Sequence, residues 1–340
     1  MTMSSFISGC AGLALSREEE DFFSHARPWG LILFARNVDN PAQVRALCEQ
    51  FRECVGRADA PVFIDQEGGR VQRMRPPHWR AWPPARAFGE MFAKEPVSAL
   101  KAACMLAWLM GKELRESGVN ADCMPVLDVP APDGHEIIGD RAYGEDPFLI
   151  AALARAAMEG LKAAGVAPVI KHIPGHGRAR ADSHKDLPIV DASLEELRRS
   201  DFLPFSMFQD APMAMTAHVV YAAIDPHSPA TLSRRVIGET IREELGFEGL
   251  LMSDDVNMKA LTGALEARCE GALDAGCDLV LHCSGDLEEM KRVAGACRPL
   301  RGAALRRAKA AGAWMGVDRI AHWDEREAQD LHARMMEAGA

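Results

Sequence analysis

The chain has 340 residues, of which 48% are hydrophobic and 26% charged, and these proportions are ordinary for a globular protein with a large core. Its formal net charge of -10 argues against nucleic acid as a partner, because phosphate backbones are bound through clustered lysine and arginine.

The cysteines and the N-terminus indicate the compartment. Nine cysteines are scattered without a CxxC pair, which is typical of reduced thiols used as small apolar residues. The N-terminus lacks the basic segment and long apolar run of a secretory signal, and no stretch has the ~18 uncharged apolar residues of a membrane span. We therefore expect a cytoplasmic protein that does not contact a membrane.

Short apolar segments alternate with longer amphipathic ones along the whole chain. The apolar segments predict eight strands, at residues 5–9, 30–35, 61–65, 119–129, 167–173, 212–220, 249–255 and 277–283. The amphipathic segments predict helices that include residues 40–56, 98–118, 146–165, 191–210 and 233–246. Two of them begin with capping residues, since Asn40 precedes Pro41 and Ser193 is followed three positions later by Glu196.

Strands that alternate with helices are typical of parallel βαβ units, and eight such units favour a single (β/α)8 barrel of the TIM type. Polar residues also follow many different strands, whereas an open sheet would gather its site at one switch point. These residues are Asp65, His172, His218, Asp254 and His282. We expect them at the mouth of a barrel formed by residues 1–300, with residues 301–340 as a C-terminal helical extension packed on it.

Two loops after predicted strands combine carboxylates with arginines. Asp65 ends a strand and is followed by a glycine pair and then by Arg73, and a second glycine-punctuated loop contains Arg141. A carboxylate and guanidinium groups around a tight turn can bind vicinal hydroxyls through paired hydrogen bonds. An ion-paired surface loop would have the same composition, so neither loop is diagnostic alone.

Asp254 and Asp255 follow directly on another predicted strand. Because strand residues alternate between faces, we expect only one of the two carboxylates to point to the barrel axis. The other is expected to brace the loop or to cap the next helix.

Residues 171–184 read KHIPGHGRARADSH. Lys171 and His172 end a strand, so their side chains are expected to reach the mouth, and glycines 175 and 177 predict a mobile loop after them. Asp182 and His184 form an Asp-x-His pair, in which the carboxylate fixes the imidazole and lets it act as acid and base near neutral pH. The alternative is a metal site formed by His172, His176, Asp182 and His184, but helical ligand spacing is absent and glycines make a poor cage.

The motifs IDQEGGRVQR, KHIPGHG, DSH and MSDD, which span residues 61 to 258, together with GDRAYG, resemble those of glycoside hydrolase family 3. The resemblance is to its bacterial β-N-acetylhexosaminidase (NagZ-type) branch. It implies a retaining exo-β-N-acetylglucosaminidase that hydrolyses terminal β-linked N-acetylglucosamine through a covalent glycosyl-enzyme intermediate. In Gram-negative bacteria it further implies 1,6-anhydro-muropeptide substrates from cell-wall (peptidoglycan) recycling.

The resemblance also assigns roles to residues that match the family motifs. It makes Asp254 the nucleophile and His184, steadied by Asp182, the general acid/base. It implies sugar binding by Asp65, Arg73, Arg141, Lys171 and His172. It implies no cofactor and no metal, a small carbohydrate as substrate, and a monomer or homodimer.

Three alternatives stay open at this stage. A phosphorylase of the same family would use phosphate in place of water, and a neutral histidine base would not repel that anionic acceptor. A metal-dependent barrel hydrolase would use the histidine cluster. A non-catalytic sugar-binding barrel would need neither a nucleophile nor an acid/base, so the presence of Asp254, Asp182 and His184 argues against it.

Overall fold

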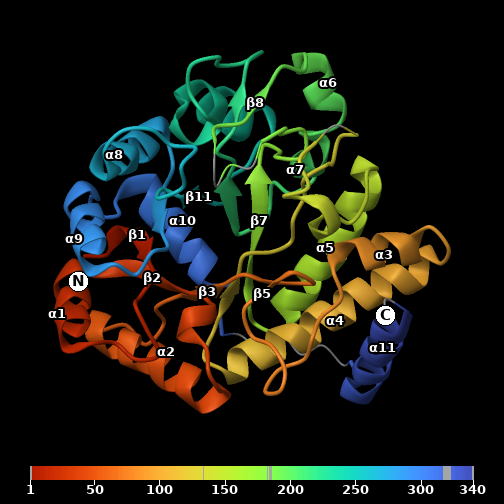
Figure 1. Cartoon of the computed structure of the whole chain (residues 1–340), viewed down its shortest axis with the longest axis horizontal. Helices are drawn as coiled ribbons and strands as arrows, with labels where there is room; N and C mark the ends of the chain where they lie inside the picture. The colour runs from red at the N-terminus through yellow and green to blue at the C-terminus, as the bar shows by residue number, and fades with distance from the viewer. Residues whose placement is uncertain (1, 133, 182, 184–185, 317–322, 339–340) are drawn as a thin grey trace.

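The computed structural model describes residues 2–132, 134–181, 183, 186–316 and 323–338. Eight parallel strands close into a barrel surrounded by helices (Figure 1), in the order β1-β12-β11-β9-β7-β6-β3-β2. They are β1 Ser4–Ser8, β2 Pro28–Leu33, β3 Val62–Ile64, β6 Ala121–Asp122, β7 Ala167–Ile173, β9 Met213–Thr216, β11 Leu250–Asp255 and β12 Leu279–His282. The predicted (β/α)8 barrel is confirmed, and each predicted strand segment overlaps one barrel strand.

The strands divide their side chains between two cores because successive residues face opposite sides. Ile32, Phe63 and Val169 belong to a buried cluster that draws on all eight strands and fills the barrel. Leu31 and Ile64 face the other way and pack into the larger cluster beneath the helices. This double burial explains why the strand segments read as nearly continuous apolar runs.

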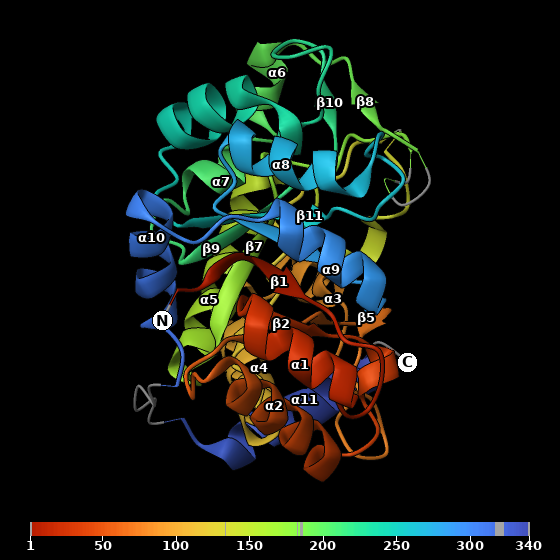
Figure 2. The ribbon, with the colours of Figure 1, turned by 90° about the vertical axis from the view of Figure 1, so that its left-hand side faces the viewer.

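The helices form the outer layer (Figure 2). They are α1 Arg17–Ala26, α2 Pro41–Val55, α3 Ala85–Phe92, α4 Pro96–Glu116, α5 Pro147–Ala163, α6 Leu194–Arg199, α7 Leu203–Ser206, a π-helical segment Val236–Glu244, α8 Leu265–Ala275, α9 Leu287–Ala296, α10 Gly302–Gly312 and α11 Glu325–Ala338. The predicted caps are confirmed: Asn40 accepts from the Gln43 N–H at 3.1 Å, and Ser193 forms a capping box with Glu196.

The prediction of one helix over residues 191–210 is wrong. The structure has two short helices, α6 and α7, separated by residues 200–202. Pro204 lies in the first turn of α7, where its missing N–H and fixed φ are tolerated, whereas in the interior of one long helix it would remove a hydrogen bond.

A small hairpin follows β3 and is not part of the barrel. It consists of β4 Gln66–Gly68 and β5 Val71–Gln72, which pair antiparallel. Gly68 and Gly69 have positive φ values of 98° and 54°, and a Cβ on Gly68 would lie 2.3 Å from the Pro83 carbonyl oxygen. The turn therefore requires glycine both for its backbone conformation and for its close approach to the segment that follows.

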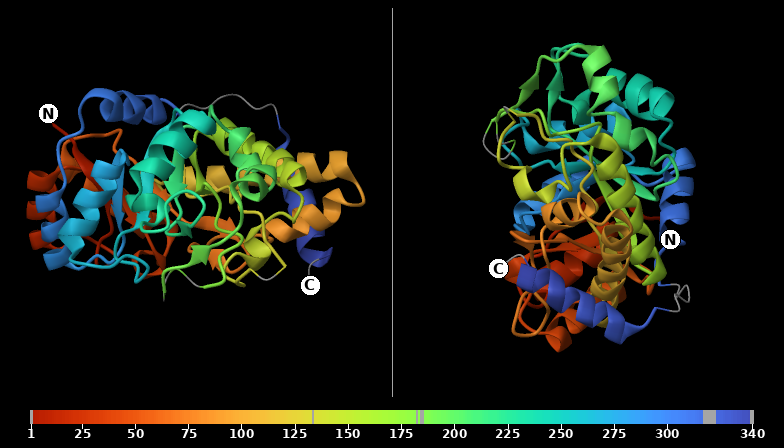
Figure 3. Two further views of the ribbon diagram at one scale, coloured as in Figure 1. Left: turned by 90° about the horizontal axis from the view of Figure 1, so that it is seen from above. Right: turned by 90° about the vertical axis from the view of Figure 1, so that its right-hand side faces the viewer.

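The C-terminal helix α11 lies along α4, on the side of the barrel where the hairpin and α3 are found (Figures 1 and 3). Among the described residues, no helix is both long enough and apolar enough to cross a membrane.

Candidate active site

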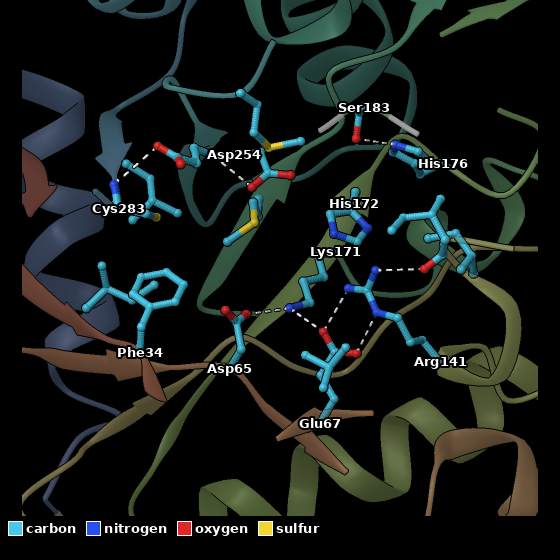
Figure 4. A pocket seen from close by; sticks show the side chains of 18 of the residues that line it. Phe34, Asp65, Glu67, Arg141, Lys171, His172, His176, Ser183, Asp254 and Cys283 are labelled. Carbon is cyan, nitrogen blue, oxygen red and sulfur yellow. Dashed lines mark hydrogen bonds and ion pairs between the residues drawn. The ribbon is translucent and has the colours of Figure 1, made fainter. Parts of the chain in front are cut away.

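A cavity of about 360 Å³ opens where the carboxyl ends of the barrel strands meet (Figure 4). Six of the eight predicted site residues line it: Asp65, Arg73, Arg141, Lys171, His172 and Asp254. The remaining two, Asp182 and His184, lie outside the described residues. Strands and loops that are distant in the chain thus bring the predicted groups to one end of the barrel, where barrel enzymes carry their active sites.

Lys171 bridges two carboxylates inside this cavity (Figure 4). Its Nζ lies 2.9 Å from Asp65 Oδ1 and 2.6 Å from Glu67 Oε1. Arg141 donates to both oxygens of Glu67 at 2.8 Å, and Arg73 donates to Asp65 Oδ2 at 2.9 Å. Three cations and two anions therefore form one connected network, which orients each group through at least one partner.

The network keeps its members ionised. Burial raises the pKa of a carboxyl, but Lys171 and Arg73 more than offset this effect and hold the pKa of Asp65 well below its usual range. Against the same effect of burial, Arg141 and Lys171 lower the pKa of Glu67 to about 2. Burial also disfavours the charged form of Lys171, yet the two carboxylates raise its pKa above the ordinary value. The cavity consequently presents charged donors and acceptors at neutral pH.

Glu67 was not among the predicted site residues. The sequence did contain a signal for it, because three cations, Arg73, Arg141 and Lys171, were predicted at the sugar site with Asp65 as its one sugar-binding carboxylate. Buried charges require partners. Glu67 stands two positions after Asp65 in the same motif and was the nearest additional carboxylate.

His172 is held by a buried carboxylate that the sequence analysis also did not select. Asp128 Oδ2 lies 2.6 Å from His172 Nδ1, and Asp128 Oδ1 accepts the backbone N–H groups of His172 and His176 at 3.2 and 2.7 Å. Burial raises the pKa of Asp128, but His172 reverses the shift and lowers it to about 2. Because this carboxylate only accepts, Nδ1 of His172 carries a proton and Nε2 is left for the cavity.

Both Lys171 and His172 reach the cavity although neighbouring strand residues normally point to opposite faces. The pairing of β7 with β9 shifts register between Lys171 and Ile173. Such an irregularity adds a residue on one strand and re-aims side chains, which is common next to active sites. The expectation that this pair reaches the mouth is confirmed.

A similar register shift separates Met252 from Asp255 in the pairing of β11 with β12. As a result Asp254 and Asp255 both border the cavity. The predicted bracing role of Asp255 is confirmed, since its Oδ1 accepts the backbone N–H groups of Asn257 and Cys283 at 3.1 and 3.2 Å. Asp254 Oδ1 accepts the N–H of Asp255 at 2.8 Å.

The segment after His172 packs closely against neighbouring backbone. A Cβ on Gly177 would lie 1.9 Å from the Val129 carbonyl oxygen, so glycine is needed there for close approach. His176 Nε2 lies 3.0 Å from Ser183 Oγ, and the Ala260 N–H donates to the Ser183 carbonyl at 3.2 Å. Burial and the neighbouring His172 lower the pKa of His176 to about 4, so its ring is neutral at pH 7.

His218 and His282 do not line the cavity, and the expectation that they lie at its mouth is wrong. Both are fully buried. His218 Nδ1 and Nε2 contact Thr231 Oγ1 and the Asp255 carbonyl at 2.7 and 3.0 Å, and His282 Nε2 lies 3.3 Å from Glu289. These contacts give both rings a structural role beneath the loops.

Among the residues whose positions are described, no group of three or more His, Cys, Asp or Glu side chains is arranged to hold a metal ion. The metal site considered from the sequence would also need Asp182 and His184, which are outside this set.

Known proteins that are similar to this chain include sugar-cleaving enzymes, in agreement with the polar, charged cavity. A family model described as the glycosyl hydrolase family 3 N terminal domain matches residues 3–309. The beta-hexosaminidase of Stenotrophomonas maltophilia (strain R551-3) is 40% identical over 301 residues, which cover 87% of this chain and 88% of that protein. The beta-hexosaminidase of Bordetella avium (strain 197N) is 38% identical over 278 residues, covering 81% and 79%.

A solved structure shares the architecture over nearly the full length. The crystal structure of NagZ from Neisseria gonorrhoeae in complex with N-trifluoroacetyl-D-glucosamine superposes with a TM-score of 0.87 at 29% identity, and the match covers 98% of both chains.

Proposed function

The chain belongs to glycosyl hydrolase family 3, as a β-N-acetylhexosaminidase of the NagZ type, and from that premise we propose that it removes terminal β-linked N-acetylglucosamine by a retaining mechanism. The observation that carries the proposal is the shared cavity. It combines Asp254, at the end of β11, with the paired charges of Asp65, Lys171, Glu67 and Arg141.

The paired charges suit a polyhydroxyl ligand. Lys171 and Arg73 offer N–H donors and Asp65 offers carboxylate oxygens, so two adjacent sugar hydroxyls can each donate and accept. Because the charges already pair with one another, these side chains keep their positions without a ligand. Binding therefore loses little free energy to the ordering of side chains. His172 offers its Nε2 atom to the cavity. Its other ring nitrogen, Nδ1, is held by Asp128, and this contact fixes the orientation of the ring.

The proposed chemistry has two steps. Asp254 attacks the anomeric carbon as the bond to the leaving oxygen breaks, and His184, steadied by Asp182, gives that oxygen a proton. The neutral His184 then takes a proton from water, which displaces Asp254 and releases the sugar with its original configuration. Ser183, which lies between these two residues in the sequence, is hydrogen-bonded to His176 at 3.0 Å.

We propose in addition that the substrate is a 1,6-anhydro-muropeptide from peptidoglycan recycling, and that the enzyme acts in the cytoplasm as a monomer or homodimer. The likeness to NagZ supports this assignment. Incubation with purified 1,6-anhydro-muropeptides should release N-acetylglucosamine, and failure to release it while aryl glycosides are cleaved would reject this substrate but not the reaction.

The reaction itself is tested by release of 4-nitrophenol from its N-acetyl-β-D-glucosaminide with excess EDTA, with and without phosphate. We expect EDTA-resistant, phosphate-independent release, with the β-anomer of the sugar appearing first in the proton NMR spectrum. Formation of sugar 1-phosphate would identify a phosphorylase instead, and loss of activity with EDTA would favour the metal-dependent alternative. First appearance of the α-anomer would refute the retaining mechanism.

A further inference from the structure

The C-terminal helix α11 reaches the region behind the sugar-binding hairpin, although it follows the part of the chain that the family model matches, which ends at residue 309. His332 Nε2 lies 2.7 Å from the Ala81 carbonyl oxygen. Since a carbonyl only accepts, Nε2 carries the proton and donates it. The same imidazole ring meets the Trp82 ring edge-to-face, with centroids 5.0 Å apart and planes at 74°.

Trp82 is in turn fastened to the hairpin formed by β4 and β5. Its carbonyl accepts the N–H of Gly69 at 2.8 Å, and its own N–H donates to Gln72 Oε1 at 3.0 Å. The turn also has no spare room on this side, because a Cβ on Gly68 would lie 2.3 Å from the Pro83 carbonyl oxygen. A displacement of the segment from Ala81 to Pro83 must therefore move the turn.

The hairpin carries the carboxylate that organises the cavity. Glu67 directly precedes Gly68 and holds both Lys171 and Arg141, at 2.6 and 2.8 Å. Asp65 directly precedes the hairpin and shares Lys171 with Glu67. The position of the turn thus sets the distance between these carboxylates and the lysine on β7.

We propose that His332 is a positioning residue for sugar binding: it fixes the segment at Ala81 and Trp82 and thereby keeps the hairpin in register with Lys171. The inference rests on the proposed role of this network in binding the sugar. His332 itself does not line the cavity and has no part in the chemistry.

The helix has other attachments, which allow His332 to be tested separately. Glu327 and Glu325 pair with Lys101 and Lys112 of α4. Ala328, Leu331 and Met335 are buried among core residues. Loss of the His332 contact should therefore leave α11 docked on α4, whereas loss of the Glu327 ion pair perturbs the same helix without touching the hairpin.

Three variants of the whole 340-residue chain separate the possibilities. His332→Phe keeps an aromatic ring but removes the donor, and His332→Gln keeps an N–H donor at similar reach. Glu327→Ala is the matched control. Hydrogen exchange of the peptide that contains Gly69 reports the hairpin without substrate, and KM and kcat for the aryl glycoside report the site.

We expect His332→Phe to speed exchange in the hairpin and to raise KM about three- to tenfold, the factor for one lost hydrogen bond, with kcat nearly unchanged. In His332→Gln, the exchange rate of the hairpin and KM should both stay near their wild-type values, and Glu327→Ala should alter neither. The proposal is overturned if Glu327→Ala matches His332→Phe, if Gln does not restore the hairpin, or if kcat falls while KM stays constant. An inactive wild type would instead reject the proposed function, and the exchange data would still decide whether His332 holds the hairpin.

Discussion

Glu67 offers the sharpest test of the charge network, through the variant Glu67→Gln. The substitution keeps the side-chain shape but removes the charged partner that Arg141 and Lys171 share, and it leaves Lys171 paired with Asp65 alone. The pKa of Glu67 is lowered from 4.5 to about 2 by these cations, against the opposing effect of burial. Such a shift corresponds to about 3 kcal/mol of stability at neutral pH, in line with the cost of breaking a buried ion pair.

The sign of the pH dependence follows from the direction of the shift. A carboxyl whose folded-state pKa is depressed contributes stability that is fully present above its unfolded pKa, here 4.5, and that is lost as the pH falls toward 2. The difference in unfolding free energy between wild type and Glu67→Gln should therefore be largest at pH 7 and should shrink between pH 5 and pH 2. Other titrating groups are shared by the two proteins and largely cancel in this difference.

Denaturant unfolding at several pH values measures this difference, and Glu266→Gln serves as the control. The pKa of Glu266 is also lowered to about 2, chiefly by hydrogen bonding to Arg292, but both partners of this pair are substantially exposed. Water and salt screen an exposed pair, so the control should stay close to wild type at every pH. A difference for Glu67→Gln that is independent of pH, or no larger than that of Glu266→Gln, would refute the reasoning.

Three further variants test the proposed chemistry. Asp254→Ala should lower kcat at least about a thousandfold. Added azide should restore turnover and yield the α-glycosyl azide, since azide attacks from the face of the sugar that the carboxylate no longer occupies. A β-glycosyl azide would contradict the assignment of Asp254 as the nucleophile. Asp128→Asn should lower kcat/KM about 10- to 100-fold, because it removes a charge-assisted hydrogen bond that orients His172; an unchanged value would show that His172 needs no such partner. His184→Ala should slow poor leaving groups far more than activated aryl ones in the first step, and equal losses on both would exclude the acid role.

The architecture could be predicted from the chain alone because each barrel strand is buried on both faces. Continuous apolar runs and intervening amphipathic segments then leave a strong periodic signal, even where β6 is reduced to Ala121–Asp122. The helix over residues 191–210 failed for a local reason, since amphipathic spacing says nothing about the break before Pro204. Periodicity detects elements more reliably than their interruptions.

The position of a residue at a strand end was the main signal for the site in the sequence, and this signal was only partly reliable. Asp65 and Asp254 lie at the ends of barrel strands and reach the cavity, yet His218 and His282 also lie at strand ends and are buried elsewhere. Alternation could not foresee that both Asp254 and Asp255 border the cavity, because a register shift is set by pairing between strands. Glu67 was missed for the complementary reason, since its role depends on cations that distant parts of the chain supply, Lys171 on β7 and Arg141 in the segment before α5.

The proposed roles separate sugar binding from proton transfer, and this separation sorts the variants by their expected kinetic effects. The groups proposed to hold the sugar lie on β7, beside the hairpin after β3 and, for Arg141, in the segment before α5. Glu67 on the hairpin joins Lys171 to Arg141 through paired charges. The proposed proton-transfer residue His184 lies outside the described residues, and its neighbour Ser183 is hydrogen-bonded to His176. Perturbation of the hairpin, directly or through His332, should therefore appear mainly in KM. Replacement of His184, or of Ser183 by alanine, should appear mainly in kcat, because sugar binding precedes and does not require the proton transfer. If Ser183→Ala raised KM and spared kcat, the loop would have to be counted among the sugar-binding elements, and the division between binding and chemistry drawn from the structure would be wrong.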